Sequence, residues 1–427
     1  MRDGEALVLD ASGPRIHGPL HRLWRLLPPQ ARREALFTAM EWLAPRPDAA
    51  APPPALPITV AGYFRAPSGL GEGARRLADM LEAAGAPVHR ADLTGALRQG
   101  PPGPRAQVPP GPGTLVVHVN GPMLPWALRA LGGSAVRGKR VLAFWNWELP
   151  RLPADWTRGY RFAHGILAAT RFVADAVCRP GGPPVEVVPY PVPEPAPAPM
   201  TRAGLGLPQD ALLFLLVFDA ASSVERKNPL GAVRAHRAAF GDRADRVLLL
   251  KTYNTGMGGA AWREVVAACA GAPNIRIIDA EMSRAEVWGL MRLCDAFVSL
   301  HRAEGVGLSL LEAMRLARPV IATGWSGNMD FMDAESALLV GCRMVPARDG
   351  RGTYGAARTD WAEPDAAEAA AGLRRLAQDA AGAPRTDLGS SSFFKSPAGI
   401  ITLVIVGVGV GYALYSTSND RIKSPAK

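Results

Sequence analysis

The chain has few cysteines, and its N-terminus lacks the pattern of a secretory signal. Its four cysteines, Cys178, Cys269, Cys294 and Cys342, are scattered. No C-x-x-C pair occurs, and no histidine lies at metal-binding spacing from a cysteine. The opening residues, MRDGEALVLDASG, have no basic region followed by an apolar stretch. We therefore expect reduced core cysteines in a cytosolic domain and no signal peptide.

The positive charge of the chain is not gathered into basic blocks. The net charge is +10, and only six of the 48 basic residues are lysine. This balance could suit nucleic acid, an anionic lipid or a phosphorylated small molecule. Because cations are not clustered with interleaved aromatic residues, nucleic acid is the least favoured partner. The length of 427 residues, with 48% hydrophobic residues, allows two or three globular domains.

Proline-rich segments divide the chain at 45–57, 99–113 and 189–200, and the last has the composition of a stiff linker. Apolar, β-rich runs alternate with helical patterns on both sides of it. The predicted strands are 58–64, 114–120, 140–145, 165–170 and 185–190 before the linker, and 212–218, 246–252, 275–279, 296–300, 319–323 and 337–340 after it. Strands that alternate with helices indicate parallel sheets built from βαβ units.

The sequence thus predicts an α/β fold of two Rossmann-like domains that face a cleft. The first domain spans 58–190 and follows a lead-in at 1–57. A linker at 191–204 connects it to the second domain at 205–385, and a tail follows at 386–427. In such folds, ligands bind at the carboxyl ends of the strands.

Two glutamates flank a glycine-containing loop in HRAEGVGLSLLEAM (301–314), which follows a predicted strand. Ser309 and Glu312 have the spacing of a capping box, which predicts a helix that opens at Ser309. In a purely structural interpretation, Glu312 accepts hydrogen bonds from free backbone N–H groups at the helix N-terminus, and Glu304 is a solvated loop residue. The position of the loop at a strand end favours a binding site instead.

Cations are placed at neighbouring strand ends. Arg226 and Lys227 precede a predicted helix, and Lys251 ends the next strand. Together with the N-terminus of a helix, they would form a receptor for a diphosphate. We assign donor binding to these three residues.

The loop itself would complete this site. Glycine allows the backbone to approach phosphate closely. Glu312 could accept hydrogen bonds from ribose hydroxyls, and Glu304 could do the same for a sugar beyond the diphosphate. The pattern predicts a nucleotide-sugar site whose loop and helix start consist of Gly305, Gly307, Leu308 and Ser309.

The segment EGVGLSLLEAM, followed by RPVIATGWSGNMDFM, resembles the donor site of retaining GT-B glycosyltransferases of the family-four type, the glycosyl transferases group 1. The resemblance covers roughly residues 58–380, with VEVVPYPV at the end of the first domain. It implies that Glu312 contacts ribose and that Glu304, a catalytic candidate, contacts the donor sugar. It also implies that the anomeric configuration is kept with help from the leaving phosphate, so no protein nucleophile is assigned.

Two departures from the family pattern stand out. The usual Gly-Arg after the first strand of the second domain is replaced by FDAASSVERKNP. The usual Gly-Gly-x-x-Glu is replaced by GWSGNMD, which leaves the role of Asn328 open.

In the first domain, Gly69, Gly71 and Gly73 open a helix after the strand at 58–64. With Asp92 about twenty residues on, they resemble a dinucleotide site. The insertion FRAPS between strand and glycines argues against that fingerprint. In the glycosyltransferase interpretation, Gly69 and Gly71 line the cleft.

Three further residues of the first domain are site candidates. His118 and Asn120 end a strand, where related enzymes place a histidine near the donor sugar; a satisfied strand-end histidine is the alternative. Glu148 is a candidate for acceptor binding beside a surface on which a sugar could stack. The alternative is a structural aromatic cluster of Trp145, Trp147 and Trp156.

The expected activity is a retaining transfer of sugar from a nucleotide-sugar to a glycan or lipid-linked acceptor. No cofactor is expected, and no metal, because the cations and the helix terminus would replace it. Glycosyltransferases of the other large fold need an Asp-x-Asp metal motif, which does not occur here. The alternatives are a dinucleotide-dependent oxidoreductase and a non-catalytic nucleotide-sugar binding protein.

The tail contains eighteen residues, 398–415, without a charge or strong polar group. That length is just enough for a transmembrane helix and too long for one buried strand. Gly407-x-x-x-Gly411 within it is a weak packing motif. Three of the six lysines follow position 394, so a foreign or replaced segment is an alternative. We expect a single-pass, membrane-associated protein with a cytoplasmic catalytic domain.

Overall fold

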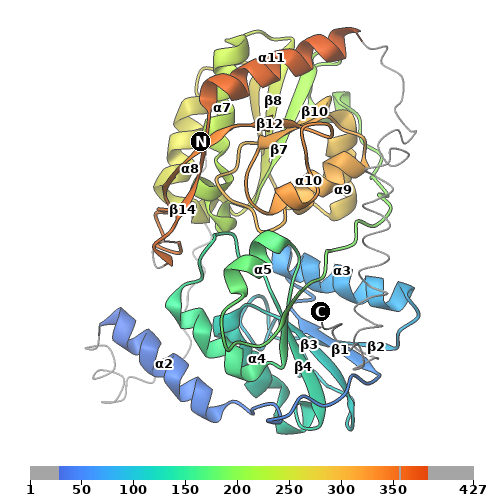
Figure 1. Cartoon of the computed structure of the whole chain (residues 1–427). Coiled ribbons are helices and arrows are strands. Elements are labelled where there is room, and N and C mark those ends of the chain that lie inside the picture. Colours follow the sequence, from blue (N-terminus) through green and yellow to red (C-terminus); the bar gives the residue numbers. More distant parts are fainter. Residues whose placement is uncertain (1–27, 355–356, 383–427) are drawn as a thin grey trace, which may run out of the picture.

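The computed structural model describes residues 28–354 and 357–382, and these form two α/β domains stacked on one another (Figure 1). The first domain is built on a six-stranded sheet in the order β2-β1-β3-β4-β5-β6, in which every pair is parallel. Its strands are β1 (Ile58–Gly62), β2 (Val88–Asp92), β3 (Gly113–His118), β4 (Lys139–Trp145), β5 (Gly165–Ala168) and β6 (Val185–Val187). Its α-helices are α2 (Pro29–Leu43), α3 (Gly69–Ala83), α4 (Leu124–Leu131) and α5 (Arg171–Val177).

The second domain has a parallel sheet in the order β12-β11-β10-β7-β8-β9. Counted from β7, this is the order of a doubly wound Rossmann sheet, whose direction of winding reverses between β7 and β10. Its strands are β7 (Leu212–Val217), β8 (Arg246–Thr252), β9 (Ile275–Asp279), β10 (Ala296–Ser299), β11 (Val320–Thr323) and β12 (Leu338–Val340). Its helices are α6 (Val224–Lys227), α7 (Pro229–Phe240), α8 (Gly259–Cys269), α9 (Arg284–Leu293), α10 (Leu308–Arg315) and α11 (Ala366–Gly382). An antiparallel pair, β13 (Cys342–Pro346) and β14 (Asp360–Pro364), precedes α11.

Continuous apolar runs form the central strands because both faces of the sheet are covered by helices. Along β7, Phe214 and Leu216 belong to the core on one face, whereas Leu213 and Leu215 belong to the core on the other. All four are almost fully buried. Each such side chain contributes about 1.5–3 kcal/mol of hydrophobic stabilisation. The strand ends are thereby fixed, and with them the loops that follow.

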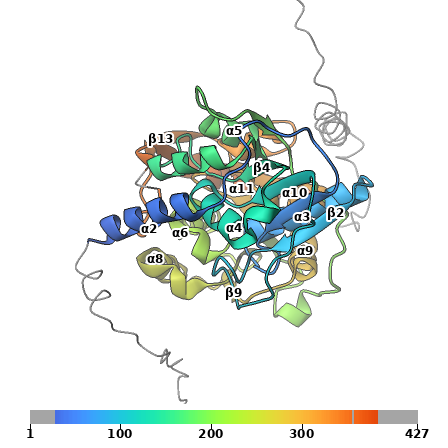
Figure 2. The ribbon, with the colours of Figure 1, turned by 90° about the horizontal axis from the view of Figure 1, so that it is seen from below.

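Every strand predicted from an apolar run is present, within a few residues of its predicted ends. Sequence reasoning missed β2, β13 and β14. These strands lie at an edge or in a small hairpin, so their side chains alternate between polar and apolar or are partly exposed. Helix α2 was also missed, and it packs on the outside of the first domain through Phe37 against Trp126 (Figure 2).

The two domains touch along several elements. Helix α5 lies at the boundary between them in Figure 1. Thr170, which precedes α5, donates a hydrogen bond to the carbonyl oxygen of Gly305 at 2.7 Å. The backbone N–H of Arg171 donates to Asp330 Oδ2 at 2.7 Å. On the other side of the boundary, Tyr253 donates to the carbonyl oxygen of Pro67 at 3.1 Å.

Residues 188–202, which include most of the predicted linker, have neither helix nor strand and connect the two sheets. Within the described ranges, no helix is both long enough and apolar enough to cross a membrane. The predicted transmembrane segment at 398–415 lies outside the described residues and stays a prediction.

Candidate functional site

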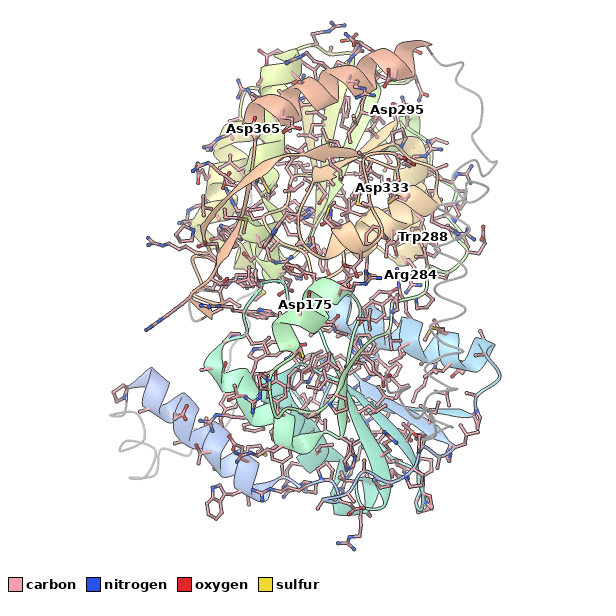
Figure 3. All side chains as sticks on the ribbon, viewed as in Figure 1. Asp175, Arg284, Trp288, Asp295, Asp333 and Asp365 are labelled. Carbon is pink, nitrogen blue, oxygen red and sulfur yellow. The ribbon has the colours of Figure 1, made fainter. Side chains whose placement is uncertain are left out.

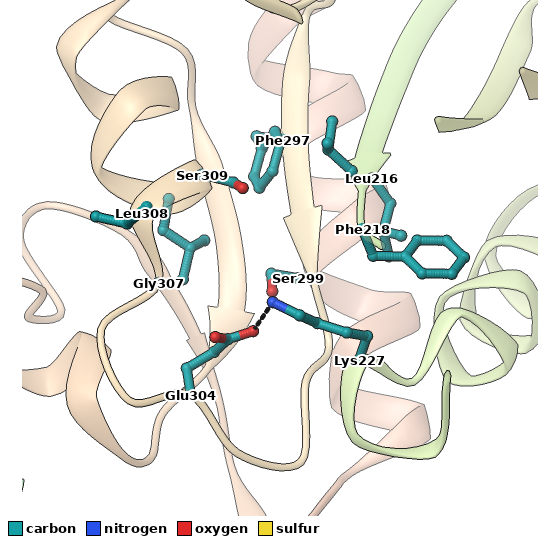
Figure 4. Close-up of a pocket in the computed structure, with 11 residues that line it drawn as sticks. Leu216, Phe218, Lys227, Phe297, Ser299, Glu304, Gly307, Leu308 and Ser309 are labelled. Atoms are coloured by element: carbon teal, nitrogen blue, oxygen red, sulfur yellow. Dashed lines mark hydrogen bonds and ion pairs between the residues drawn. The ribbon is translucent and has the colours of Figure 1, made fainter. Parts of the chain in front are cut away.

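A pocket opens at the carboxyl ends of β7 and β10, where α10 begins (Figure 4). This is the point at which the winding of the sheet reverses, and Rossmann-like folds bind ligands there. The pocket is lined by Leu216, Val217, Phe218, Lys227, Phe297, Ser299, Glu304, Gly307, Leu308, Ser309 and Leu310. Five of the residues predicted to bind a donor are among them.

Glu304 is held as an ionised carboxylate by two cations. Lys227 Nζ lies 2.5 Å from one carboxylate oxygen, and Arg226 Nη1 lies 3.3 Å from the other. Burial by itself raises the pKa of Glu304, but the charges of Lys227 and Arg226 outweigh it and lower this pKa to about 2. Glu304 is therefore a hydrogen-bond acceptor at neutral pH and not a proton donor.

The two cations differ in access. Arg226 is almost fully buried and donates hydrogen bonds to the carbonyl oxygen of Ala303 at 2.7 Å and to Ser222 Oγ at 2.6 Å. The Lys227 side chain is 22% exposed and lines the pocket. Lys227 can thus reach a bound phosphate, whereas Arg226 fixes the loop that carries Glu304.

Asn228 directs Lys227 toward the pocket. Its φ of +52° ends α6, and its side chain caps α7 by accepting a hydrogen bond from the N–H of Gly231. The side-chain amide also donates to the carbonyl oxygen of Leu300 at the end of β10. Asparagine tolerates the left-handed region better than most residues. One residue therefore turns the chain and ties Lys227 to the neighbouring strand.

The predicted capping box at Ser309 is wrong. Helix α10 begins at Leu308, its N-cap is Gly307, and no side chain caps it. Gly307 has a φ of +88°, which glycine adopts without the penalty of a Cβ atom. Because the Ser309 hydroxyl is not used as a cap, it lies on the first turn of α10 and lines the pocket. The first N–H groups of α10 have no side-chain cap, and binding of an anion by them stays a prediction.

Gly305 is required by the first domain and not only by a ligand. A Cβ atom on Gly305 would lie 2.6 Å from the carbonyl oxygen of Trp147. Thr170 donates to the Gly305 carbonyl from the same side. The close approach that the sequence assigned to phosphate is made here by protein backbone.

Glu312 lies on the second turn of α10 and forms an ion pair with Arg76 on α3 of the first domain. The Arg76 side chain is 1% exposed and that of Glu312 10%. Glu312 does not line the pocket, because Arg76 covers its carboxylate. Sequence reasoning did not single out Arg76, since its spacing from Glu72 is that of an ordinary surface ion pair on a helix.

The structure does not bring Lys251 to the pocket. Its Nζ atom lies 4.6 Å from the centre of the Tyr253 ring, and the residue is 2% exposed. Burial lowers the pKa of Lys251, while nearby carboxylates, with Asp219 first among them, oppose this effect. Of the three predicted donor cations, only Lys227 lines the pocket.

His118 lies in the core of the first domain, away from the pocket lining. Its Nε2 is 2.6 Å from Tyr190 Oη, and the Tyr190 hydroxyl donates to Asn146 Oδ1 at 3.0 Å. Its ring is stacked on Phe144 with centroids 4.8 Å apart. Burial lowers the pKa of His118 to about 4, so the imidazole is neutral at pH 7. His118 is thus a buried strand-end residue that is engaged through Nε2, while its buried Nδ1 has no hydrogen-bond partner among the described residues.

The glycines before α3 and Asn120 shape the loops of the first domain. Gly69 is exposed with open space around its Cα, whereas a Cβ atom on Gly71 would lie 2.4 Å from the carbonyl oxygen of Ala66. Asn120 Oδ1 accepts a hydrogen bond from the N–H of Asn146 at 2.9 Å. Gly71 and Asn120 thus hold the turns after β1 and β3, and none of these residues lines the pocket.

Glu148 lies between the domains, with one carboxylate oxygen 3.8 Å from Arg226 Nη2. Its side chain is 27% exposed, so an acceptor hydroxyl could reach it. Burial raises the pKa of Glu148, and the charge of Arg226 opposes that rise.

The predicted sugar-stacking surface beside Glu148 is wrong. Trp145, Trp147 and Trp156 are at most 5% exposed. They pack edge to face on one another, and Tyr354 from the second domain packs on Trp147 at 5.7 Å. The tryptophans therefore form a structural cluster, because burying large aromatic surfaces stabilises the core more than exposing them.

A supporting loop that sequence reasoning missed orients Glu304. Ser326 Oγ accepts a hydrogen bond from the Glu304 N–H at 2.9 Å. Asn328, whose role the sequence left open, has its Oδ1 3.1 Å from Nε2 of the buried His301. The signal was present in GWSGNMD, which directly follows a strand of the same sheet. Because GWSGNMD stands where the family has Gly-Gly-x-x-Glu, the supporting role of Ser326 and Asn328 was not predicted.

Among the residues that the structure describes, no group of three or more His, Cys, Asp or Glu side chains is placed to bind a metal ion. The alternative of a dinucleotide site in the first domain finds little support. Asp92, the candidate ribose ligand of a dinucleotide, is 2.5 Å from Arg65 Nε and accepts hydrogen bonds from Thr94.

Comparison with known proteins gives a family match within the second domain. Residues 242–351 match the family model described as Glycosyl transferases group 1. This segment contains Glu304, Glu312 and the whole of α10. No curated protein sequence matches the chain.

Solved structures share the fold at low sequence identity. Sucrose-phosphate synthase from Thermosynechococcus elongatus is 16% identical, covers 85% of this chain and 99% of its own, and has a TM-score of 0.59. A chain from E. coli, described as trehalose-6-phosphate bound with UDP-2-fluoro glucose, is 11% identical over 86% of this chain and 100% of its own, with a TM-score of 0.54. The pneumococcal O-GlcNAc transferase GtfA is 11% identical, with a TM-score of 0.42. The match covers 71% of this chain but only 55% of GtfA.

These findings agree with the geometry. The matched segment supplies the glycine loop and helix start at the reversal point of the second sheet, and the two-domain fold is that of the GT-B structures. Residues 242–351 are thus similar to the glycosyl transferases group 1, and the chain shares its fold of two Rossmann-like domains with sucrose-phosphate synthase.

Proposed function

We propose that the chain transfers a sugar from a nucleoside diphosphate sugar to a hydroxyl of a glycan or lipid-linked acceptor, with retention at the anomeric carbon. The observation that carries this proposal is the pocket at β7 and β10. It combines one accessible cation, one ionised carboxylate and the N-terminal turn of α10.

The diphosphate of the donor lies between Lys227 and the start of α10. The Lys227 ammonium group, on a flexible side chain, can leave Glu304 and pair with a phosphate instead. The start of α10 adds N–H donors and the positive end of the helix dipole. These groups neutralise the charge that develops on the leaving diphosphate, and transfer therefore proceeds without a metal ion. Arg226 acts indirectly by holding the loop of Glu304 in place.

The sugar and the ribose occupy opposite ends of this diphosphate. Glu304 accepts hydrogen bonds from hydroxyls of the transferred sugar, which its low pKa permits at any physiological pH. Glu312 accepts hydrogen bonds from the ribose once Arg76 has moved away from it. Glu148, which lies 3.8 Å from Arg226 between the domains, orients the acceptor.

The transfer step needs no protein nucleophile. The acceptor oxygen forms a bond with the anomeric carbon while the bond from that carbon to the phosphate oxygen breaks. The acceptor proton passes to the departing phosphate oxygen. Glu304 is engaged by two cations, which supports its role as a binding group in this step.

A thermal-shift screen of UDP-, GDP- and ADP-sugars, with NAD as a control, tests the proposal. UDP-glucose is the first donor to try, since the E. coli fold neighbour is bound with UDP-2-fluoro glucose. A ligand at 100 times its dissociation constant adds about 2.7 kcal/mol of stability. NMR of the product then reports the anomeric configuration. Stabilisation by NAD alone, or inversion of configuration, would contradict the proposal.

A further inference from the structure

Four charged residues meet across the domain boundary and form a chain of three ion pairs. Arg76 on α3 pairs with Glu72 one turn earlier, at 2.6 Å, and with Glu312 on α10. Arg284 at the start of α9 pairs with Glu72 from the side of the second domain. Figure 3 shows Arg284 on the part of the second domain that faces α3. We call Glu72, Arg76, Arg284 and Glu312 the interdomain clasp.

The clasp is tightly enclosed. Arg76 is the most buried member, at 1% side-chain exposure, and Glu312 follows at 10%. The more exposed members are Glu72 at 18% and Arg284 at 29%. A buried charge that loses its partner is strongly destabilised, so Arg76 and Glu312 each favour the arrangement in which they touch. This arrangement holds the first domain against the second.

The same contact occupies the carboxylate that the proposed donor needs. Glu312 is the only carboxylate on α10. Its side chain is 10% exposed and is not among the residues that line the pocket. The hydroxyls of a ribose can donate hydrogen bonds to Glu312 only after the Arg76 guanidinium has moved away from it. The two interactions are therefore mutually exclusive.

We infer that Arg76 is a positioning residue that sets donor affinity by competing with the ribose of the nucleotide for Glu312. This inference rests on the proposed function. The exchange leaves no uncompensated buried charge, because Arg76 keeps Glu72 as its partner when Glu312 turns to the ribose. Glu72 thus makes the release of Glu312 possible, and the clasp closes the empty cleft until a nucleotide displaces it.

A double-mutant cycle on nucleotide affinity tests this competition. Titration calorimetry would measure the binding of UDP, GDP and ADP to the full chain and to the variants Arg76→Met, Glu312→Ala and the double variant. Methionine keeps the buried stem of the side chain and removes only the charged group. We expect Arg76→Met to tighten nucleoside diphosphate binding about fivefold or more, the usual range of such couplings. In the Glu312→Ala background, the same change should have no effect.

Arg75→Met is the matched control. Arg75 is the preceding residue on α3. Among the described residues, its hydrogen-bond partners are all in the first domain: the carbonyl oxygens of Phe64 and Ala66, and Glu72 of the clasp. Its replacement should leave nucleotide affinity unchanged. Inorganic pyrophosphate, which has no ribose, should not bind more tightly to Arg76→Met than to the unaltered chain. Small-angle scattering should show a wider interdomain angle in empty Arg76→Met.

Weaker or unchanged nucleotide binding by Arg76→Met would overturn the inference, as would tightening that persists without Glu312. Should Arg76→Met fail to fold, Arg76→Gln takes its place, because its neutral amide can still donate to Glu72. If the unaltered chain binds a nucleotide through Lys227 and Arg76→Met binds no tighter, only this inference fails. If no protein in the series binds any nucleotide, the proposed function fails with it.

Discussion

Replacing Glu304 by Gln should destabilise the protein at neutral pH by an amount that fades in acid. The carboxylate lies 2.5 Å from Lys227 Nζ and 3.3 Å from Arg226 Nη1, and its side chain is only 10% exposed. Glutamine keeps the shape and a hydrogen-bond acceptor, but it removes the negative charge between the two cations. The change therefore isolates the electrostatic part of the interaction.

The magnitude follows from the pKa of Glu304, which falls from its usual 4.5 to about 2. Each unit corresponds to about 1.4 kcal/mol, so the charged form of Glu304 stabilises the fold by about 3 kcal/mol. The pKa is depressed in the folded state, so this stability is fully present above pH 4.5 and is lost as the pH falls through 4.5 toward 2. Below both values, Glu304 is protonated in the folded and unfolded chains alike and contributes nothing.

Urea unfolding between pH 7 and pH 3 measures the difference between the two proteins. Urea is preferable to guanidinium chloride, since the salt would screen the ion pairs. Glu335→Gln, at an exposed position, is the control and should change stability by less than about 0.5 kcal/mol at every pH. A stability difference for Glu304→Gln that stays constant from pH 7 to pH 3 would refute the electrostatic argument.

Three further predictions concern the site. Lys227→Ala should weaken binding of a nucleoside diphosphate at least tenfold and leave binding of the nucleoside unchanged, as calorimetry can show; equal losses for both ligands would move the phosphate elsewhere. Gly305→Ala should loosen the contact between the domains, because its Cβ would lie 2.6 Å from the Trp147 carbonyl oxygen, whereas Gly133→Ala, with open space around it, should not. Small-angle scattering would compare the two variants, and identical profiles would count against the contact. Sugar transfer should persist in EDTA, and a loss of turnover restored by Mg²⁺ would show that Lys227 and α10 do not suffice.

Local patterns in the sequence determined the fold class and the position of the site. Apolar runs alternate with amphipathic segments along the chain. This alternation can be read from residues that are neighbours in sequence, and it predicted the parallel sheets. The order of the strands placed the loop of Glu304 and the start of α10 at a strand end, where such folds bind ligands. Lys227 was found for the same reason, since it lies in the segment between β7, the first strand of its sheet, and the helix that follows.

Only the tertiary structure decided which charges meet and which candidates are buried. Arg76 and Glu312 are 236 residues apart, and no local period links them. His118 and the three tryptophans lie among residues typical of a site, yet the packing of α3, β4 and the Tyr354 segment encloses them in the core. Burial depends on what the opposite element contributes, and a single segment does not carry that information. The sequence therefore pointed to the loop and helix start that line the pocket, and the contact between the two domains decided which of the candidate side chains are covered.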